Sequence, residues 1–183
     1  MLAPVDITGV RLETQRLILR PWTREDLRDF YAYSSIEGLG QMAGWTPHKT
    51  IDESRTILDS FIRHKKTFAI ELKETGRVIG SLGIEEPDPD PEETKLGREL
   101  GYVLHKDYWG QGLMPEAVRA VISWCFDTLH YDFLTCSHFD WNHQSKRVIE
   151  KCGFRYFSTT RSETRYDTVE NSVNYIRCKE NHT

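Results

Sequence analysis

The sequence has few cysteines, no surplus of positive charge and no long apolar run. Its 4 cysteines, at positions 125, 136, 152 and 178, form no C-x-x-C pair, so their spacing indicates neither a disulfide framework nor a zinc site. The 24 Lys and Arg against 28 Asp and Glu give a net charge of −4, which argues against a general nucleic-acid-binding protein. No apolar run approaches the roughly 18 residues that mark a membrane span.

The remaining composition is that of an ordinary soluble domain. The chain has 183 residues, of which 38% are hydrophobic and 28% charged, enough for one domain with a proper core. The opening "MLAPVDITGV" has neither the basic nor the apolar region of a secretory signal. We therefore expect reduced, mostly structural thiols, no nucleic-acid or membrane partner, and a cytoplasmic location.

The N-terminal third predicts one strand followed by two helices. The stretch 11–22, "RLETQRLILRPW", is β-prone and closes on a proline. Thr23 and Asp26 then form a capping-box pattern, and Thr50 and Glu53 form another. Each box precedes apolar residues at helical spacing, which predicts a helix after each.

The middle of the chain predicts a hairpin, an acidic loop and a strand–helix–strand unit. "TFAIEL" and "RVIGSLGIE" flank the turn "KETG", and the acidic, proline-rich segment 85–95 follows as a solvated loop. The strand 98–105 leads through two glycines into a helix from Pro115, since proline is favoured at the first helical position. A further strand covers 132–139. Parallel pairing of these two strands puts a ligand site at the carboxyl end of the first.

The C-terminal part predicts a short helix and two final strands. Asn142 is placed to cap a helix over 142–152, and Gly153 to end it. The whole order predicts a mixed α/β (α+β) single domain over 1–183, with its core at about 11–178. We expect a central, mostly antiparallel mixed sheet, a parallel strand–helix–strand unit at the ligand site, and about four helices.

The stretch "YWGQGLMPEA", residues 108–117, places two glycines directly before a helix. Gly110 and Gly112 allow positive φ and close backbone approach. A helix N-terminus adds unpaired N–H groups and partial positive charge, which together suit a phosphate. A tight turn with nothing bound is the alternative. A Rossmann or P-loop nucleotide site is not matched, because the third glycine and the Lys-Ser/Thr pair are missing.

Three separated segments share their order and spacing with one family: "LETQRLILRPW", "ELGYVLHKDYWGQGLMPEA" and "NHQSKRVIEKCGF". Together they resemble the GNAT acetyltransferase superfamily, in particular its ribosomal-protein N-terminal (Rim-type) branch. The resemblance spans about residues 11–178. It implies an acyltransferase, an N-acetyltransferase that takes its acetyl group from acetyl-CoA.

The resemblance also implies how acetyl-CoA is held. The glycine loop would bind the pyrophosphate through backbone N–H groups, and the preceding strand would pair with the pantetheine arm. The residues so implied are Tyr102, Val103, Leu104, Trp109, Gly110, Gln111, Gly112, Leu113, Met114, Asn142 and Ser145. Trp109 replaces the usual basic or amide residue that opens the family pattern, and Met114 replaces the usual closing Gly or Ala.

Catalytic roles follow from the same resemblance. The Tyr102 N–H would polarise the thioester carbonyl. Ser145 would protonate the leaving thiolate, because Ile149 stands where many superfamily members carry a tyrosine. The acceptor amine must lose a proton, so a carboxylate base is useful. We favour Glu163, which falls near the place of a Rim-type base, over Glu99, which strand alternation puts on the face opposite Tyr102. Either carboxylate can equally be an ordinary surface charge.

Metal or covalent catalysis is not indicated. His105, His138 and His143 have no metal-ligand spacing on one helix face, so no metal is expected. Cys152 lies beside a helix terminator, where packing is the more usual role of a thiol. The resemblance implies direct transfer to the amine rather than a ping-pong mechanism.

The acceptor amine is not readable from the sequence. A protein N-terminal α-amine fits the branch, and polyamines, aminoglycoside-like antibiotics, amino acids and other small amines fit the fold equally well. The acidic 85–93 loop would attract any of these cations. A non-catalytic acyl-CoA-binding sensor with the same fold is the alternative from another class. A homodimer is common in the resembling branch.

Overall fold

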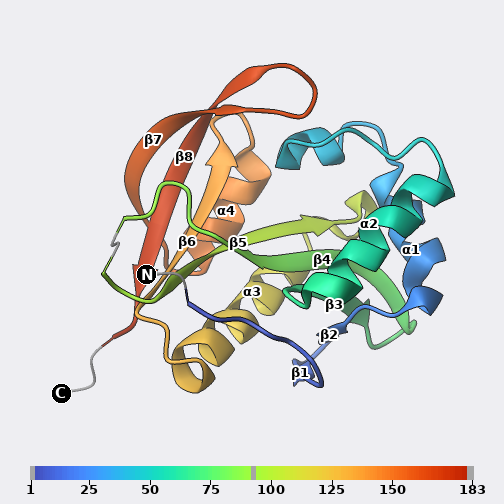
Figure 1. Cartoon of the computed structure of the whole chain (residues 1–183), viewed down its shortest axis with the longest axis horizontal. Helices are drawn as coiled ribbons and strands as arrows, with labels where there is room; N and C mark the ends of the chain where they lie inside the picture. The colour runs from blue at the N-terminus through green and yellow to red at the C-terminus, as the bar shows by residue number, and fades with distance from the viewer. Residues whose placement is uncertain (1–2, 92–93, 181–183) are drawn as a thin grey trace.

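The computed structural model describes residues 3–91 and 94–180, which form one eight-stranded mixed sheet. Its order is β1-β2-β3-β4-β5-β6-β8-β7, and all neighbours are antiparallel except the parallel pair β5–β6 (Figure 1). The strands are β1 (Leu12–Glu13), β2 (Leu17–Pro21), β3 (Thr67–Leu72), β4 (Arg77–Glu85), β5 (Gly97–Leu104), β6 (Phe133–Phe139), β7 (Arg155–Glu163) and β8 (Val169–Cys178). The predicted mixed sheet with its parallel unit is confirmed.

Two pairs of helices cover the two faces of this sheet. Helices α1 (Leu27–Ser34) and α2 (Ile51–His64) enclose a smaller core cluster that includes Trp22 and Phe30. Helices α3 (Leu113–Ser123) and α4 (His143–Lys151) enclose the larger cluster on the opposite face. Side chains alternate between the faces along each strand, so Leu100 and Leu104 join the larger cluster while Val103 packs against the smaller one. In the described residues no helix is long and apolar enough to cross a membrane.

The predicted helix caps are confirmed. Thr50 caps α2 by accepting a hydrogen bond from the Glu53 N–H at 3.3 Å, and Asn142 caps α4 in the same way. Gly153 follows α4 with φ of 78°, the left-handed conformation that suits glycine. These local signals were sufficient to place the helix boundaries, because capping depends on near neighbours in the sequence.

Two predicted boundaries are wrong. The strand expected over 11–22 is two strands, because the Thr14 side chain accepts from the Leu17 N–H at 2.9 Å and closes a turn between β1 and β2. Helix α3 begins at Leu113, not at Pro115. Proline is tolerated there because first-turn N–H groups have no intrahelical partner to lose.

The parallel strands β5 and β6 separate at the position where the ligand site is expected. Their pairing runs only from Gly97 with Phe133 to Glu99 with Thr135, although β5 continues to Leu104. Beyond Glu99, β5 keeps its partner β4, and β6 keeps its partner β8. The last residues of β5 therefore turn one backbone edge toward a gap in the sheet.

Candidate active site

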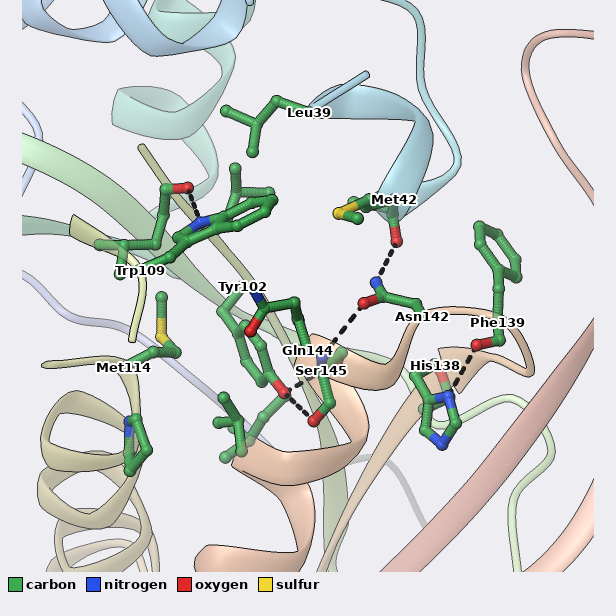
Figure 2. Close-up of a pocket in the computed structure, with 18 of the residues that line it drawn as sticks. Leu39, Met42, Tyr102, Trp109, Met114, His138, Phe139, Asn142, Gln144 and Ser145 are labelled. Atoms are coloured by element: carbon green, nitrogen blue, oxygen red, sulfur yellow. Dashed lines mark hydrogen bonds between the residues drawn. The ribbon is translucent and has the colours of Figure 1, made fainter. Parts of the chain in front are cut away.

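A cavity of about 300 Å³ occupies this gap between the strands (Figure 2). Its walls come from the carboxyl end of β5, the end of β6, the glycine loop and the start of α4. The 3-10 segment η2 (Gly40–Ala43) closes it from the other side. The residues that the argument uses are Glu99–Leu104, Trp109, Gly110, Gly112–Met114, Ser137, Asn142 and Ser145.

The glycine loop has the geometry that its sequence predicts. Gly110 and Gly112 have φ of 75° and 76°, and Gly112 directly precedes the first residue of α3. Residues with a Cβ are sterically disfavoured in this left-handed region, so the backbone conformation favours glycine at both positions. The loop thereby brings the unpaired N–H groups of a helix N-terminus to the cavity wall. Of the residues predicted to bind the donor, only Gln111 does not line the described cavity.

The backbone of β5 presents alternate residues to the gap. The His105 N–H donates to Ile79 O on β4 at 2.8 Å, so by alternation Val103 pairs with Ser81 in the same sense. The N–H groups of Tyr102 and Leu104 consequently point to the β6 side. The Trp109 indole donates to Leu104 O at 2.8 Å, which confirms that this carbonyl faces away from β4 (Figure 2). The backbone N–H and C=O of Val103 therefore point toward β4 and away from the gap.

Tyr102 and Ser145 form a hydrogen-bonded pair inside the cavity. The Tyr102 hydroxyl lies 2.9 Å from the Ser145 Oγ and also donates to Ser145 O at 3.3 Å (Figure 2). Burial raises the pKa of Tyr102 well above its ordinary value, so the phenol remains protonated at neutral pH. Sequence reasoning assigned Tyr102 only a backbone role. Strand alternation carried the missing signal, because it turns this side chain to the face that α4 covers.

Asn142 links the start of α4 to η2. Its Oδ1 accepts from the Ser145 N–H at 3.1 Å, and its Nδ2 donates to Met42 O at 3.2 Å. The side chain is buried. Asn142 thus fixes the backbone of Ser145 as well as the segment that closes the cavity.

The β7–β8 hairpin holds η2 from the outside. The Tyr166 hydroxyl donates to Gln41 O at 3.0 Å, and the Arg165 N–H donates to Gly44 O at 2.9 Å. Figure 1 shows the tip of this hairpin arching toward η2. Sequence reasoning missed η2, because the residues of this segment do not by themselves predict these distant contacts.

Glu99 lines the cavity from the face of β5 opposite to the face that carries the Tyr102 side chain, as strand alternation predicts. Its Oε1 accepts from the Ser137 hydroxyl at 2.8 Å, and its Oε2 accepts from the Asp88 N–H at 3.2 Å. Burial is the largest influence on its pKa and raises it above the ordinary 4.5. Gly101, next but one along β5, leaves open space where a side chain would stand. The carboxylate therefore borders a space that an acceptor amine can enter.

Glu163 lies elsewhere. It ends β7, opposite Val169, and its side chain is exposed. It is not among the residues that line the cavity. The structure therefore brings Glu99, and not Glu163, together with Tyr102 and Ser145.

His138 is hydrogen-bonded to the main chain, and Cys152 is buried. His138 Nδ1 lies 2.7 Å from Phe139 O, and since a carbonyl can only accept, this nitrogen carries the proton. Among the described residues, no group of three or more His, Cys, Asp and Glu side chains is arranged as metal ligands. Cys152 is buried at the end of α4, and burial raises the pKa of its thiol to about 11. A thiol protonated at neutral pH is a poor nucleophile.

Comparison with known proteins identifies the family. The profile described as "Acetyltransferase (GNAT) domain" matches residues 16–155. The chain belongs to this family and is an acyltransferase of the N-acetyltransferase type. It is 26% identical over 172 residues to "Uncharacterized N-acetyltransferase YoaA" of Bacillus subtilis, which covers 88% of this chain and 95% of the relative.

Solved structures of acetyltransferases share the fold. The ribosomal-protein-S5-alanine acetyltransferase from Vibrio fischeri superposes with a TM-score of 0.74 at 18% identity, over 95% of this chain and 99% of its own. The microcin C7 self-immunity acetyltransferase MccE, in complex with acetyl-CoA and AMP, superposes with a TM-score of 0.77 at 14% identity, over 91% and 94%. The predicted GNAT-like architecture is thus confirmed.

Proposed function

We propose that this protein transfers an acetyl group from acetyl-CoA directly to a primary amine. The observation that carries this proposal is one cavity in which three features meet. These are the glycine loop at the start of α3, the open backbone edge of β5, and the partly buried carboxylate of Glu99. A solved neighbour that contains acetyl-CoA supports the choice of donor.

The donor fits the cavity in two parts. The N–H groups of Gly112, Leu113 and Met114 would receive the pyrophosphate at the helix N-terminus. The N–H groups of Tyr102 and Leu104 would pair with the pantetheine arm, which fills the missing strand position between β5 and β6. The two interactions together would bring the thioester beside Tyr102.

The surrounding residues then supply the chemistry. Glu99 would accept the proton of the incoming amine, directly or through the Ser137 hydroxyl. The Tyr102 N–H would stabilise the oxyanion that forms on the acetyl carbonyl. Ser145, oriented by its hydrogen bond to the Tyr102 hydroxyl, would give a proton to the leaving thiolate and recover one from solvent, so that thioester and amine become amide and free thiol. These reaction steps need no acyl-enzyme intermediate, which agrees with the protonated thiol of Cys152.

For the acceptor we propose a protein N-terminal α-amine, as in the Rim-type branch. The similarity to the Vibrio fischeri enzyme, named for its ribosomal-protein substrate, supports this choice. A small-molecule amine is the alternative that the same cavity accommodates. Acetylation from this donor also favours a cytoplasmic location.

Thermal unfolding with acetyl-CoA, CoA, NAD and ATP tests the donor. A ligand at about 100 times its Kd stabilises the folded state by about 2.7 kcal/mol, so acetyl-CoA and CoA should raise the Tm while NAD and ATP leave it unchanged. The absence of a Tm shift with acetyl-CoA at millimolar concentration would contradict the proposal.

A comparison of turnover with peptide N-termini, polyamines and other small amines then identifies the acceptor class. Binding without turnover of any amine would support the acyl-CoA sensor instead.

A further inference from the structure

The turn between β1 and β2 contacts the glycine loop, although the two segments lie about 95 residues apart. Arg16 Nη1 donates to Gln111 O at 2.9 Å. The same guanidinium lies against Glu116, in the first turn of α3, through Nε and Nη2 at 2.8 and 2.7 Å from Oε2. Arg16 thus touches the loop before the helix and the helix itself.

Glu116 is in turn held by the backbone of the same turn. Its Oε1 accepts from the Arg16 N–H at 2.8 Å and from the Thr14 hydroxyl at 2.6 Å. Burial alone would raise the pKa of Glu116, but these hydrogen bonds outweigh it and hold the pKa below its ordinary value. The carboxylate is therefore ionised at neutral pH, and the Arg16–Glu116 contact is a multiply hydrogen-bonded ion pair.

The contact between Arg16 and Gln111 O fixes the direction of one peptide plane. In a trans peptide the carbonyl of one residue and the N–H of the next point in opposite directions. Arg16 holds the Gln111 carbonyl on the outer side of the loop, so the Gly112 N–H points to the other side. Gly112 lines the cavity between β5 and β6, and it also borders the shallow groove beside Arg16 and Glu116. Without this anchor Gly112, which tolerates either sign of φ, would allow the peptide to turn over and present its carbonyl to the phosphate.

We propose that Arg16, held by Glu116, is a positioning residue that orients the Gly112 N–H toward the pyrophosphate of the donor. This inference rests on the proposed function, because it assumes that the glycine loop binds a pyrophosphate. Arg16 acts through the Gln111–Gly112 peptide and does not itself touch the donor.

The test compares two donors that differ only in the part that the loop would bind. Acetyl-CoA carries the pyrophosphate, whereas S-acetylpantetheine lacks it. Arg16→Ala should raise the Kd for acetyl-CoA about tenfold, the size expected for the loss of one charge-assisted hydrogen bond. The same substitution should leave kcat/KM with S-acetylpantetheine within about twofold of the wild type. Equal losses with both donors would indicate general damage and overturn the proposal.

Glu116→Gln separates positioning from direct phosphate binding. If Arg16 positions the loop, weakening its partner should also raise the Kd for acetyl-CoA. If Arg16 binds phosphate itself, freeing it from Glu116 should leave that Kd unchanged or lower it, which would overturn the proposal. Arg16→Lys retains the charge but not the several N–H donors of the guanidinium, so its Kd for acetyl-CoA should lie between those of wild type and Arg16→Ala. This variant supplies the test if Arg16→Ala does not fold.

Arg119 provides the matched control. Arg119 lies on α3, the helix that carries Glu116. It is exposed and donates to Lys151 O at 2.7 Å rather than to the loop. Arg119→Ala should leave the Kd for both donors unchanged. A wild-type protein that binds no acetyl-CoA would contradict the proposed function, whereas a wild type that binds and an Arg16→Ala variant that binds equally well would contradict only the positioning role.

Discussion

The hydroxyl of Tyr102 lies 2.9 Å from the Oγ of Ser145, which joins a strand and a helix that are 43 residues apart in the sequence. Neither hydroxyl is isolated, because the Asn142 side chain fixes the Ser145 backbone and the phenol is held protonated by burial. The pair can therefore act as one unit, in which the protonated Tyr102 hydroxyl orients Ser145 for the delivery of a proton.

We predict that Ser145→Ala and Tyr102→Phe each lower kcat about a hundredfold, the usual scale for a lost general acid. The Kd for acetyl-CoA should change little, since the donor contacts proposed from the structure are main-chain N–H groups. The double variant should lose little more than either single one, because groups that act as a unit are not additive. Tyr156→Phe removes a phenol that is 60% exposed and should leave kcat unchanged. Additive losses would contradict the pairing.

Glu99→Gln should lower kcat/KM for the acceptor at neutral pH, because an amide cannot accept the amine's proton. The deficit should shrink above about pH 8, where a free α-amine is already deprotonated. The pH profile of kcat/KM measures this for both proteins. Glu163→Gln is the control and should match the wild type. A larger loss in Glu163→Gln than in Glu99→Gln would restore the base that the sequence alone favoured.

The raised pKa of Glu99 also predicts how stability changes with pH. Between the unfolded-state pKa, near the ordinary 4.5, and the higher folded-state pKa, the folded protein binds more protons. The contribution of Glu99 is therefore fully present below about pH 4.5 and is lost as the pH rises through the folded pKa. Glu99→Gln should be more stable than wild type at pH 7, and the difference in Tm should vanish near pH 4. A constant difference would show that burial does not control this carboxyl.

Gly110→Ala should lower stability by about 1 kcal/mol, because φ of 75° is unfavourable for alanine. It should also weaken acetyl-CoA binding, since any relaxation of the loop moves the donor N–H groups. Gly76 is a matched control in the β3–β4 turn, with φ of 68° and, like Gly110, open space for an added Cβ. Gly76→Ala should cost similar stability and leave the Kd for acetyl-CoA unchanged. Equal Kd values in both variants would mean that the loop is only a turn.

The features predicted correctly depend on near neighbours. The β3–β4 hairpin, the Asn142 cap and the positive φ of Gly110 and Gly112 each follow from a few adjacent residues. The family resemblance extended these to the whole sheet, because its three segments lie on different elements. The parallel β5–β6 pair was predicted from the strand–helix–strand order of residues 98–139.

The features that were missed depend on tertiary contacts. Both Glu99 and Glu163 are carboxylates in predicted strands, and only the separation of β5 from β6 decides which one reaches the cavity. The η2 segment likewise owes its place to Asn142 and Tyr166, which lie at least 100 residues away. No spacing rule connects such residues.

Distant parts of the chain hold the η2 segment through main-chain carbonyls, those of Gln41, Met42 and the following Gly44. Met42 lines the cavity, and the structure describes no hydrogen bond from its side chain. Substitution of Met42 can therefore reshape this end of the cavity while these main-chain hydrogen bonds remain. The glycine loop tolerates substitution less well, because its conformation favours glycine at two positions. Mutational drift in this chain should consequently diversify the amine it accepts long before it alters the acyl carrier it uses.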